Sequence, residues 1–68
     1  MIEIEVGPEG IRLGQLLKYA GAVDTGGEAK ALLEAGEVEV NGEVEARRGR
    51  QLGSGDEVRV HDRVWRLV

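Results

Sequence analysis

The 68-residue chain has no cysteine, no phenylalanine, and one residue each of tryptophan, tyrosine and proline. Without cysteine it forms no disulfide and offers no thiolate nucleophile or thiolate metal ligand, which is typical of a reducing compartment. The shortage of aromatic rings disfavours RNA-binding modes in which several exposed side chains stack on bases. Of the two rings present, Tyr19 and Trp65, we expect Trp65 to cover the core.

Long apolar segments are also missing. No apolar run approaches the roughly 20 residues that a membrane-spanning helix needs, and the first ten residues, "MIEIEVGPEG", are acidic where a secretory signal is basic. We therefore expect a cytoplasmic protein with no membrane contact. A chain of this length buries only about 60% of its unfolded surface, so residues 1–68 are predicted to form one domain with a simple core.

Catalytic and metal-binding side chains are too few to form a recognisable site. Ser54 is the one serine and His61 the one histidine, and they do not form a pattern of nucleophile, base and acid. One histidine among scattered carboxylates gives no zinc-ligand spacing. The acidic side chains alternate along strands or lie outside helices, which predicts a solvated face. We expect no enzymatic activity, no cofactor and no metal ion.

The hydrophobic pattern predicts a strand followed by two helices. "IEIEV" alternates apolar and acidic residues, which predicts an N-terminal strand over residues 2–6. Apolar residues at i, i+3, i+4 and i+7 predict helices over residues 11–21 and 25–36. The second helix begins with Thr25 and Glu28 in the spacing of a reciprocal cap. We expect the helices to pack as an antiparallel or crossed pair.

About four short strands are predicted after the helices, which makes the fold α+β. Apolar alternation on both sides of Asn41 and Gly42 predicts a hairpin with a two-residue type I′ turn. "DEVRV" and "VWRLV", on either side of "HDR", predict a second hairpin over residues 57–68. The alternation in "VWRLV" leaves open which of its faces is buried.

Charge is unevenly distributed along the chain, whose formal net charge is −4. Residues 1–45 hold ten acidic and three basic side chains, whereas residues 46–68 hold three acidic and six basic ones. Such asymmetry indicates a charged partner. Arginines that only decorate a solvated sheet face would give the same distribution, so both interpretations stay open at this point.

Arg47, Arg48 and Arg50 form the densest basic segment. Their planar guanidinium groups match the geometry of phosphate oxygens, and Gly49 lets the backbone approach a ligand closely. The segment follows a rigid hairpin, which makes it a candidate site for an anionic ligand.

Further basic or N–H donor groups lie on the predicted helices. Arg12, Lys18 and Lys30 lie off the apolar stripes, and the free N–H groups of Gly26 and Gly27 form a generic anion site at the start of the second helix. Periodicity alone does not decide whether these groups share one surface with the arginine segment.

Four segments in this order resemble the S-four domain, an RNA-binding module named after protein four of the small ribosomal subunit. They are "RLGQLLKYAG", "TGGEAKALLEAGEVEVNG", "RRGRQL" and "GDEVRV". The resemblance covers residues 11–60 and is strongest to short stand-alone bacterial versions, the YbcJ-like proteins. It implies that the two helices and the adjacent hairpin form one face that binds structured RNA, largely through phosphates.

The family's motifs assign individual residues by resemblance. Arg12 matches the arginine of the Arg-Leu-Asp opening, Thr25 the helix cap and Asn41 the "VNG" turn. Gly14 stands where most members have aspartate, and Gly26 where they have an arginine that contacts RNA. These departures imply that the basic contacts shift toward Lys18, Lys30 and the "RRGR" segment.

The primary hypothesis is a non-catalytic, monomeric protein that binds structured RNA, ribosomal or transfer, by shape and backbone contacts, with the ribosome as a further partner. The alternative is a protein-interaction module that docks on an acidic surface of a ribosome-associated or RNA-processing factor, with the N-terminal strand as a docking edge. The candidate RNA-binding residues are Arg12, Lys18, Thr25, Gly26, Gly27, Lys30, Asn41, Arg47, Arg48 and Arg50.

Overall fold

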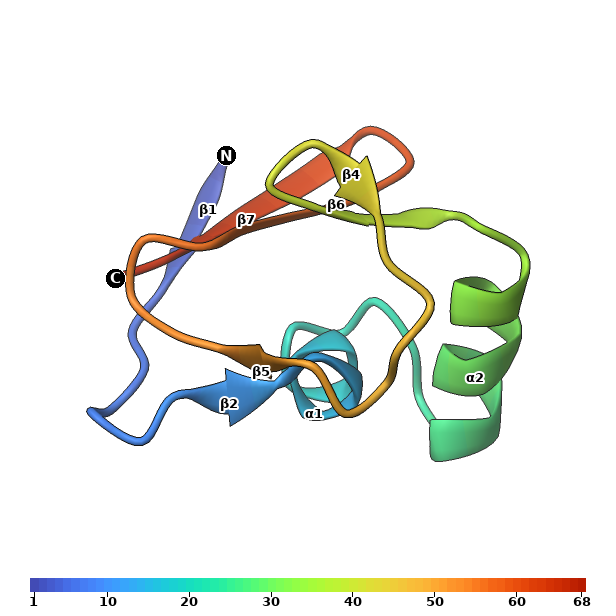
Figure 1. Cartoon of the computed structure of the whole chain (residues 1–68), viewed down its shortest axis with the longest axis horizontal. Helices are drawn as coiled ribbons and strands as arrows, with labels where there is room; N and C mark the ends of the chain where they lie inside the picture. The colour runs from blue at the N-terminus through green and yellow to red at the C-terminus, as the bar shows by residue number, and fades with distance from the viewer.

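The computed structural model describes residues 1–68 and shows two layers, in which both helices lie under one face of a five-stranded sheet (Figure 1). The elements are β1 Ile2–Ile4, β2 Ile11–Arg12, α1 Leu13–Tyr19, α2 Gly26–Glu34, β3 Val38–Val40, β4 Glu43–Val44, β5 Gln51–Leu52, β6 Glu57–Val60 and β7 Arg63–Leu67. The predicted α+β class is confirmed.

The first helix is shorter than its apolar spacing predicts. Ile11 and Arg12 are extended and form β2, which pairs antiparallel with β5 in a separate two-stranded ladder. Helix α1 begins at Leu13, and Gly21 follows its end with a φ of 78°, as expected for a helix-terminating glycine. The prediction missed β2 because a two-residue strand carries no periodicity of its own.

The second helix begins with half of the predicted reciprocal cap. The Thr25 hydroxyl accepts the Glu28 N–H at 3.1 Å. The Glu28 carboxylate, however, accepts from the Thr25 hydroxyl at 3.4 Å rather than from the Thr25 backbone N–H. Gly36 has a φ of 73° just past the helix, as predicted. Figure 1 shows α1 end-on and α2 from the side, so the helices cross rather than run antiparallel.

The sheet has the strand order β1-β7-β6-β3-β4. Asn41 and Gly42 both have positive φ, 53° and 87°, which confirms the type I′ turn between β3 and β4. The predicted second hairpin is confirmed: β6 and β7 pair antiparallel, and only His61 and Asp62 lie in the turn because Arg63 already pairs with Val60. Strand β1 pairs parallel with β7, a contact that the sequence pattern did not reveal.

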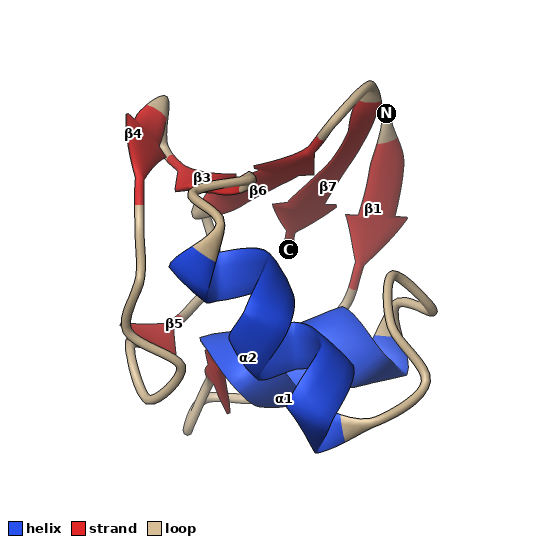
Figure 2. Cartoon of the chain, turned by 90° about the vertical axis from the view of Figure 1, so that its right-hand side faces the viewer, coloured by secondary structure: helices blue, strands red, loops and turns tan.

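The core lies between the sheet and the helices (Figure 2). Fourteen buried apolar residues form one cluster, to which α1 contributes Leu13, Leu16 and Leu17. Trp65 on β7, only 1% exposed, belongs to this cluster, as expected for a core residue. Because Trp65 and Leu67 point inward, the intervening Arg66 points to the outer face, which answers the question that "VWRLV" left open.

Candidate nucleic-acid interface

The arginine loop, residues 46–50, is fixed against the start of α1. It connects β4 to β5, and its Arg48 and Arg50 carbonyl oxygens accept the N–H groups of Gly14 and Leu13, each at 2.9 Å. The first N–H groups of a helix have no partner within the helix itself. The loop therefore satisfies two of them, and its backbone position is set by α1.

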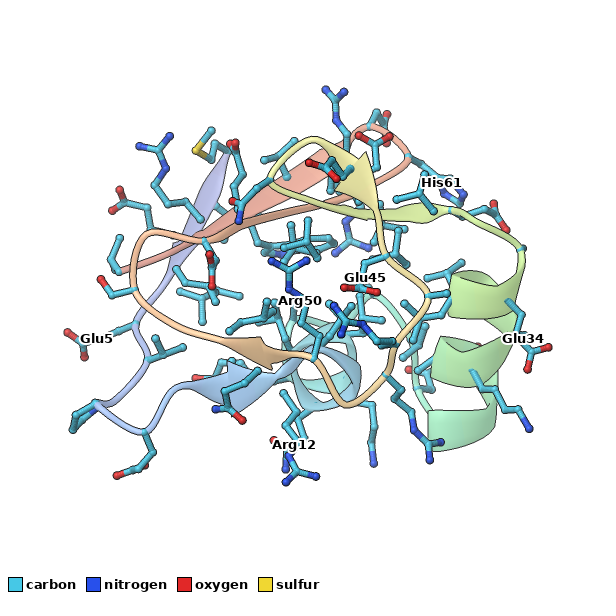
Figure 3. All side chains as sticks on the ribbon, in the orientation of Figure 1. Glu5, Arg12, Glu34, Glu45, Arg50 and His61 are labelled. Atoms are coloured by element: carbon cyan, nitrogen blue, oxygen red, sulfur yellow. The ribbon has the colours of Figure 1, made fainter.

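Glu45 holds two of the loop's arginines. Its carboxylate accepts the Arg47 backbone N–H at 3.0 Å, the Arg47 guanidinium at 3.0 and 3.2 Å, and Arg50 at 3.1 Å. Hydrogen bonds from Arg47 are the main reason that the pKa of Glu45 falls to about 2, and the same pair raises the pKa of Arg47. Figure 3 shows Glu45 and Arg50 turned toward one another.

This contact corrects the expectation that all acidic side chains lie on a solvated face. Glu45 is only 7% exposed, and it is the one buried charged residue of the chain. A buried carboxylate is stable when it is paired and hydrogen-bonded. Its single negative charge is shared by Arg47 and Arg50, so both arginines are partly neutralised.

Arg48 is the arginine of the loop that has no acidic partner, because none of the ion pairs involves it. Its side chain lies across Gly14 in the first turn of α1. A Cβ atom on Gly14 would collide with the Arg48 Cγ atom. The glycine that departs from the family's usual aspartate therefore makes room for the Arg48 side chain.

Arg48 borders an open hollow of about 570 Å³, here called the basic hollow. The lining residues come from β2, both helices and the arginine loop: Arg12, Gly14, Gln15, Lys18, Gly26, Ala29, Arg48 and Gly49. Three of them are cations and none is acidic. Arg12 points outward at this end of the molecule (Figure 3), and neither Arg12 nor Lys18 forms an ion pair.

The second helix contributes further donor groups. The N–H groups of Gly26 and Gly27, at the start of the helix capped by Thr25, have no acceptor within the chain. Lys30 lies one turn further along α2 and makes an exposed contact with Glu34 at 3.9 Å, which holds it only weakly. A smaller hollow beside the first is lined by both Lys30 and Arg48, so the two cations lie near one another.

Asn41 lies apart from the basic hollow. Its amide nitrogen donates to Asp56 at 3.0 Å, and its amide oxygen accepts the Glu57 N–H at 2.9 Å. The bond from Asn41 is the largest cause of the lowered pKa of Asp56. Of the predicted site residues, the structure thus brings Arg12, Lys18, Gly26 and Arg48 together around the hollow. The Asn41 side chain instead forms hydrogen bonds to other residues of the protein.

Sequence reasoning missed Gln15 and Ala29, which also line the basic hollow. Gln15 lies three residues before Lys18, a spacing that places both side chains on one face of α1, so this signal was available. The position of Ala29 depends on how α2 crosses α1, which the sequence does not reveal.

Metal and membrane sites are not found. No group of three or more histidine, cysteine, aspartate or glutamate side chains is placed to hold a metal ion. Neither helix has the length and apolar character required to cross a bilayer.

Comparisons with known proteins agree on one family. The S4 (S-four) domain model matches residues 2–68. A Bacillus subtilis (strain 168) protein named "Probable ribosome maturation protein RlbA" is 47% identical over 57 residues, which span 84% of this chain and 80% of that protein. The solution structure of YbcJ from E. coli, described as having an αL motif involved in RNA binding, has a TM-score of 0.76 and 29% identity. This alignment covers 100% of this chain and 87% of YbcJ.

Proposed function

Because the chain belongs to the S4 domain family, as its sequence motifs indicated, we propose that it is a non-catalytic protein that binds structured RNA through the sugar–phosphate backbone. The basic hollow is the centre of the docking surface. Arg12, Lys18 and Arg48 contact phosphate oxygens, and Lys30 extends the surface along α2. The N–H groups of Gly26 and Gly27 are available to a further phosphate oxygen.

The observation that carries this proposal is the gathering of three cations without a single acid around one hollow. The chain as a whole has a net charge of −4, so a random surface region of this protein would be acidic. Unpaired cations that face one space attract a polyanion locally, whereas the acidic remainder repels it. This distribution both binds RNA and orients it.

The donor chemistry of the hollow favours phosphate over bases. Arginine and lysine side chains only donate hydrogen bonds, and the oxygen of Gln15, the one amide side chain in the lining, already accepts the Arg12 N–H at 3.1 Å. Base edges present donors as well as acceptors, whereas phosphate oxygens only accept. Tyr19 and Trp65 do not line the hollow, so no aromatic platform is available for stacking.

The proposed ligand is ribosomal or transfer RNA, and the proposed setting is the cytoplasm, with the protein acting as a monomer. The name of the Bacillus subtilis relative points to ribosome maturation, and that of YbcJ to RNA binding. A relative with such a name makes a folded ribosomal RNA, or a ribosomal particle that exposes it, the first ligand to test.

Charge reversal tests the proposal. Fluorescence anisotropy with labelled fragments of ribosomal and transfer RNA should show binding by the wild-type protein, and the double variant R12E/R48E should lose it. R59E/R66E is the matched control, because it also reverses two charges, and Arg59 and Arg66 are exposed on the outer sheet face, outside the hollow. Equal affinity of R12E/R48E and wild type, or equal losses in R12E/R48E and R59E/R66E, would rule out the hollow as the docking site.

A second candidate function, docking on a protein, is favoured by one observation. Strand β1 is an edge of the five-stranded sheet, with Ile2 53% exposed and the acidic Glu3 and Glu5 beside it. An exposed edge can pair with a strand of another protein. Ile2→Ser changes this exposed edge and leaves the buried Ile4 in place. It should leave RNA affinity unchanged if RNA is the ligand of the hollow, and should weaken pull-down of a protein partner if β1 is the docking edge.

A further inference from the structure

Two glycines of the basic hollow have no structural reason to be glycine. Gly10, Gly21, Gly36, Gly42 and Gly55 have positive φ, where other residues are strained, and Gly14 is covered by Arg48. Gly26 and Gly49 have neither property. Their φ is not positive, and a Cβ atom built on either would meet no atom of the protein within 4 Å.

Glycine at such positions is unfavourable for the fold. It increases the conformational freedom of the unfolded chain, and within a helix it is among the weakest helix formers. Gly26 is the first residue of α2, and Gly49 lies in the arginine loop. Where such a residue also lines a candidate ligand site, a functional role explains why glycine stands there.

Both glycines line the same hollow although they come from different elements. Arg12, Lys18 and Arg48 surround the same space. The backbone N–H of Gly26 has no acceptor in the protein. A methyl group at either position would project into open space that the ligand must occupy, and would keep the ligand at a distance from the peptide backbone. Unlike the arginine that the resemblance implies at position 26 in most members, it offers the ligand no charge in return.

From this arrangement we propose that Gly26 and Gly49 determine binding by leaving two walls of the basic hollow bare, so that an RNA sugar–phosphate backbone packs directly on the peptide backbone. This inference rests on the proposed RNA-binding function and adds to it the fit of the ligand. Binding then depends on how closely the RNA backbone approaches the peptide backbone. A substitution that adds one methyl group and removes no charge should therefore weaken binding.

The test compares affinity with stability in the variants Gly26→Ala and Gly49→Ala. Alanine at an unstrained glycine position reduces the freedom of the unfolded chain, so Tm should rise by about 2–8 °C. The Kd for a labelled ribosomal RNA fragment should rise about tenfold or more, as expected for loss of a charge-assisted hydrogen bond. A variant that is more stable and binds more weakly is not explained by damage to the fold.

Gly53→Ala is the matched control. Gly53 also has no positive φ and no atom within 4 Å of a built Cβ, but it does not line the hollow. It should keep wild-type affinity. If R48E loses binding while Gly26→Ala and Gly49→Ala bind like wild type, the inference is overturned and the proposed function survives. If wild-type protein fails to bind RNA, the proposed function fails and this inference fails with it.

Discussion

Removing Arg48 should change the salt dependence of RNA binding more than removing Arg47, its neighbour in the same loop. Arg48 faces the basic hollow and has no acidic partner, whereas Arg47 donates three hydrogen bonds to Glu45. Each phosphate neutralised by a protein cation releases counterions, which makes affinity fall as salt rises. An arginine already neutralised by a carboxylate contributes less to that release.

The magnitude follows from the number of free cations. The hollow has three, Arg12, Lys18 and Arg48. At about 0.7–0.9 per phosphate, the slope of log K against log salt should lie between about −2 and −3, so affinity should fall about 20- to 40-fold between about 50 and about 200 mM salt. Arg48→Gln should reduce the slope by about one unit. Arg47→Gln should reduce it by less than about half a unit.

The assay is a fluorescence anisotropy titration of wild type, Arg48→Gln and Arg47→Gln with one labelled ribosomal RNA fragment at several salt concentrations. Both variants lose one positive charge, so net charge is matched. Circular dichroism melts check that the loop change does not unfold the protein. Equal slopes for the two variants would refute the argument that Glu45 sets Arg47 apart from Arg48.

Three further changes test other parts of the structure. Leu17→Ala removes a fully buried core side chain and should lower the free energy of unfolding by about 2–5 kcal/mol in urea titrations. In wild type, the pKa of Glu45 is lowered to about 2, so its ionised carboxylate contributes its full stabilisation of the fold above the ordinary pKa of 4.5. This contribution is lost as the pH falls from 4.5 toward 2. Glu45→Gln should make urea midpoints less dependent on pH across that window, and an unchanged dependence would contradict the role of this carboxylate. Gly14→Ala should displace the Arg48 side chain and weaken RNA binding about as much as Arg48→Ala does.

Local features of the fold were predictable from the sequence. The turn at Asn41 and Gly42 depends on two adjacent residues that tolerate positive φ, and the cap at Thr25 depends on one side chain and one nearby N–H. Both therefore leave a short-range signal. The pairing of β1 with β7, and of β2 with β5, joins segments far apart in the chain and too short to carry a clear pattern.

The candidate site was predictable in its residue types but not in its geometry. Helical spacing and the arginine segment identified Arg12, Lys18 and Arg48, which share the basic hollow. The burial of Glu45 was not predictable, because strand alternation groups it with the solvated acids. Its burial depends on the folded loop, which places Arg47 and Arg50 within hydrogen-bond distance of its carboxylate. Which arginine stays free is decided by that tertiary contact.

The most direct test of the central claim is a titration of isotope-labelled protein with a structured ribosomal RNA fragment, followed residue by residue through backbone amide NMR signals. The account predicts that the largest shifts cluster on the residues around the basic hollow, Gly14, Lys18, Gly26, Arg48 and Gly49. Signals from Arg59 and Arg66, on the outer face of the sheet, should stay in place. Shifts concentrated on that outer face or along β1, with the hollow unaffected, would contradict the account.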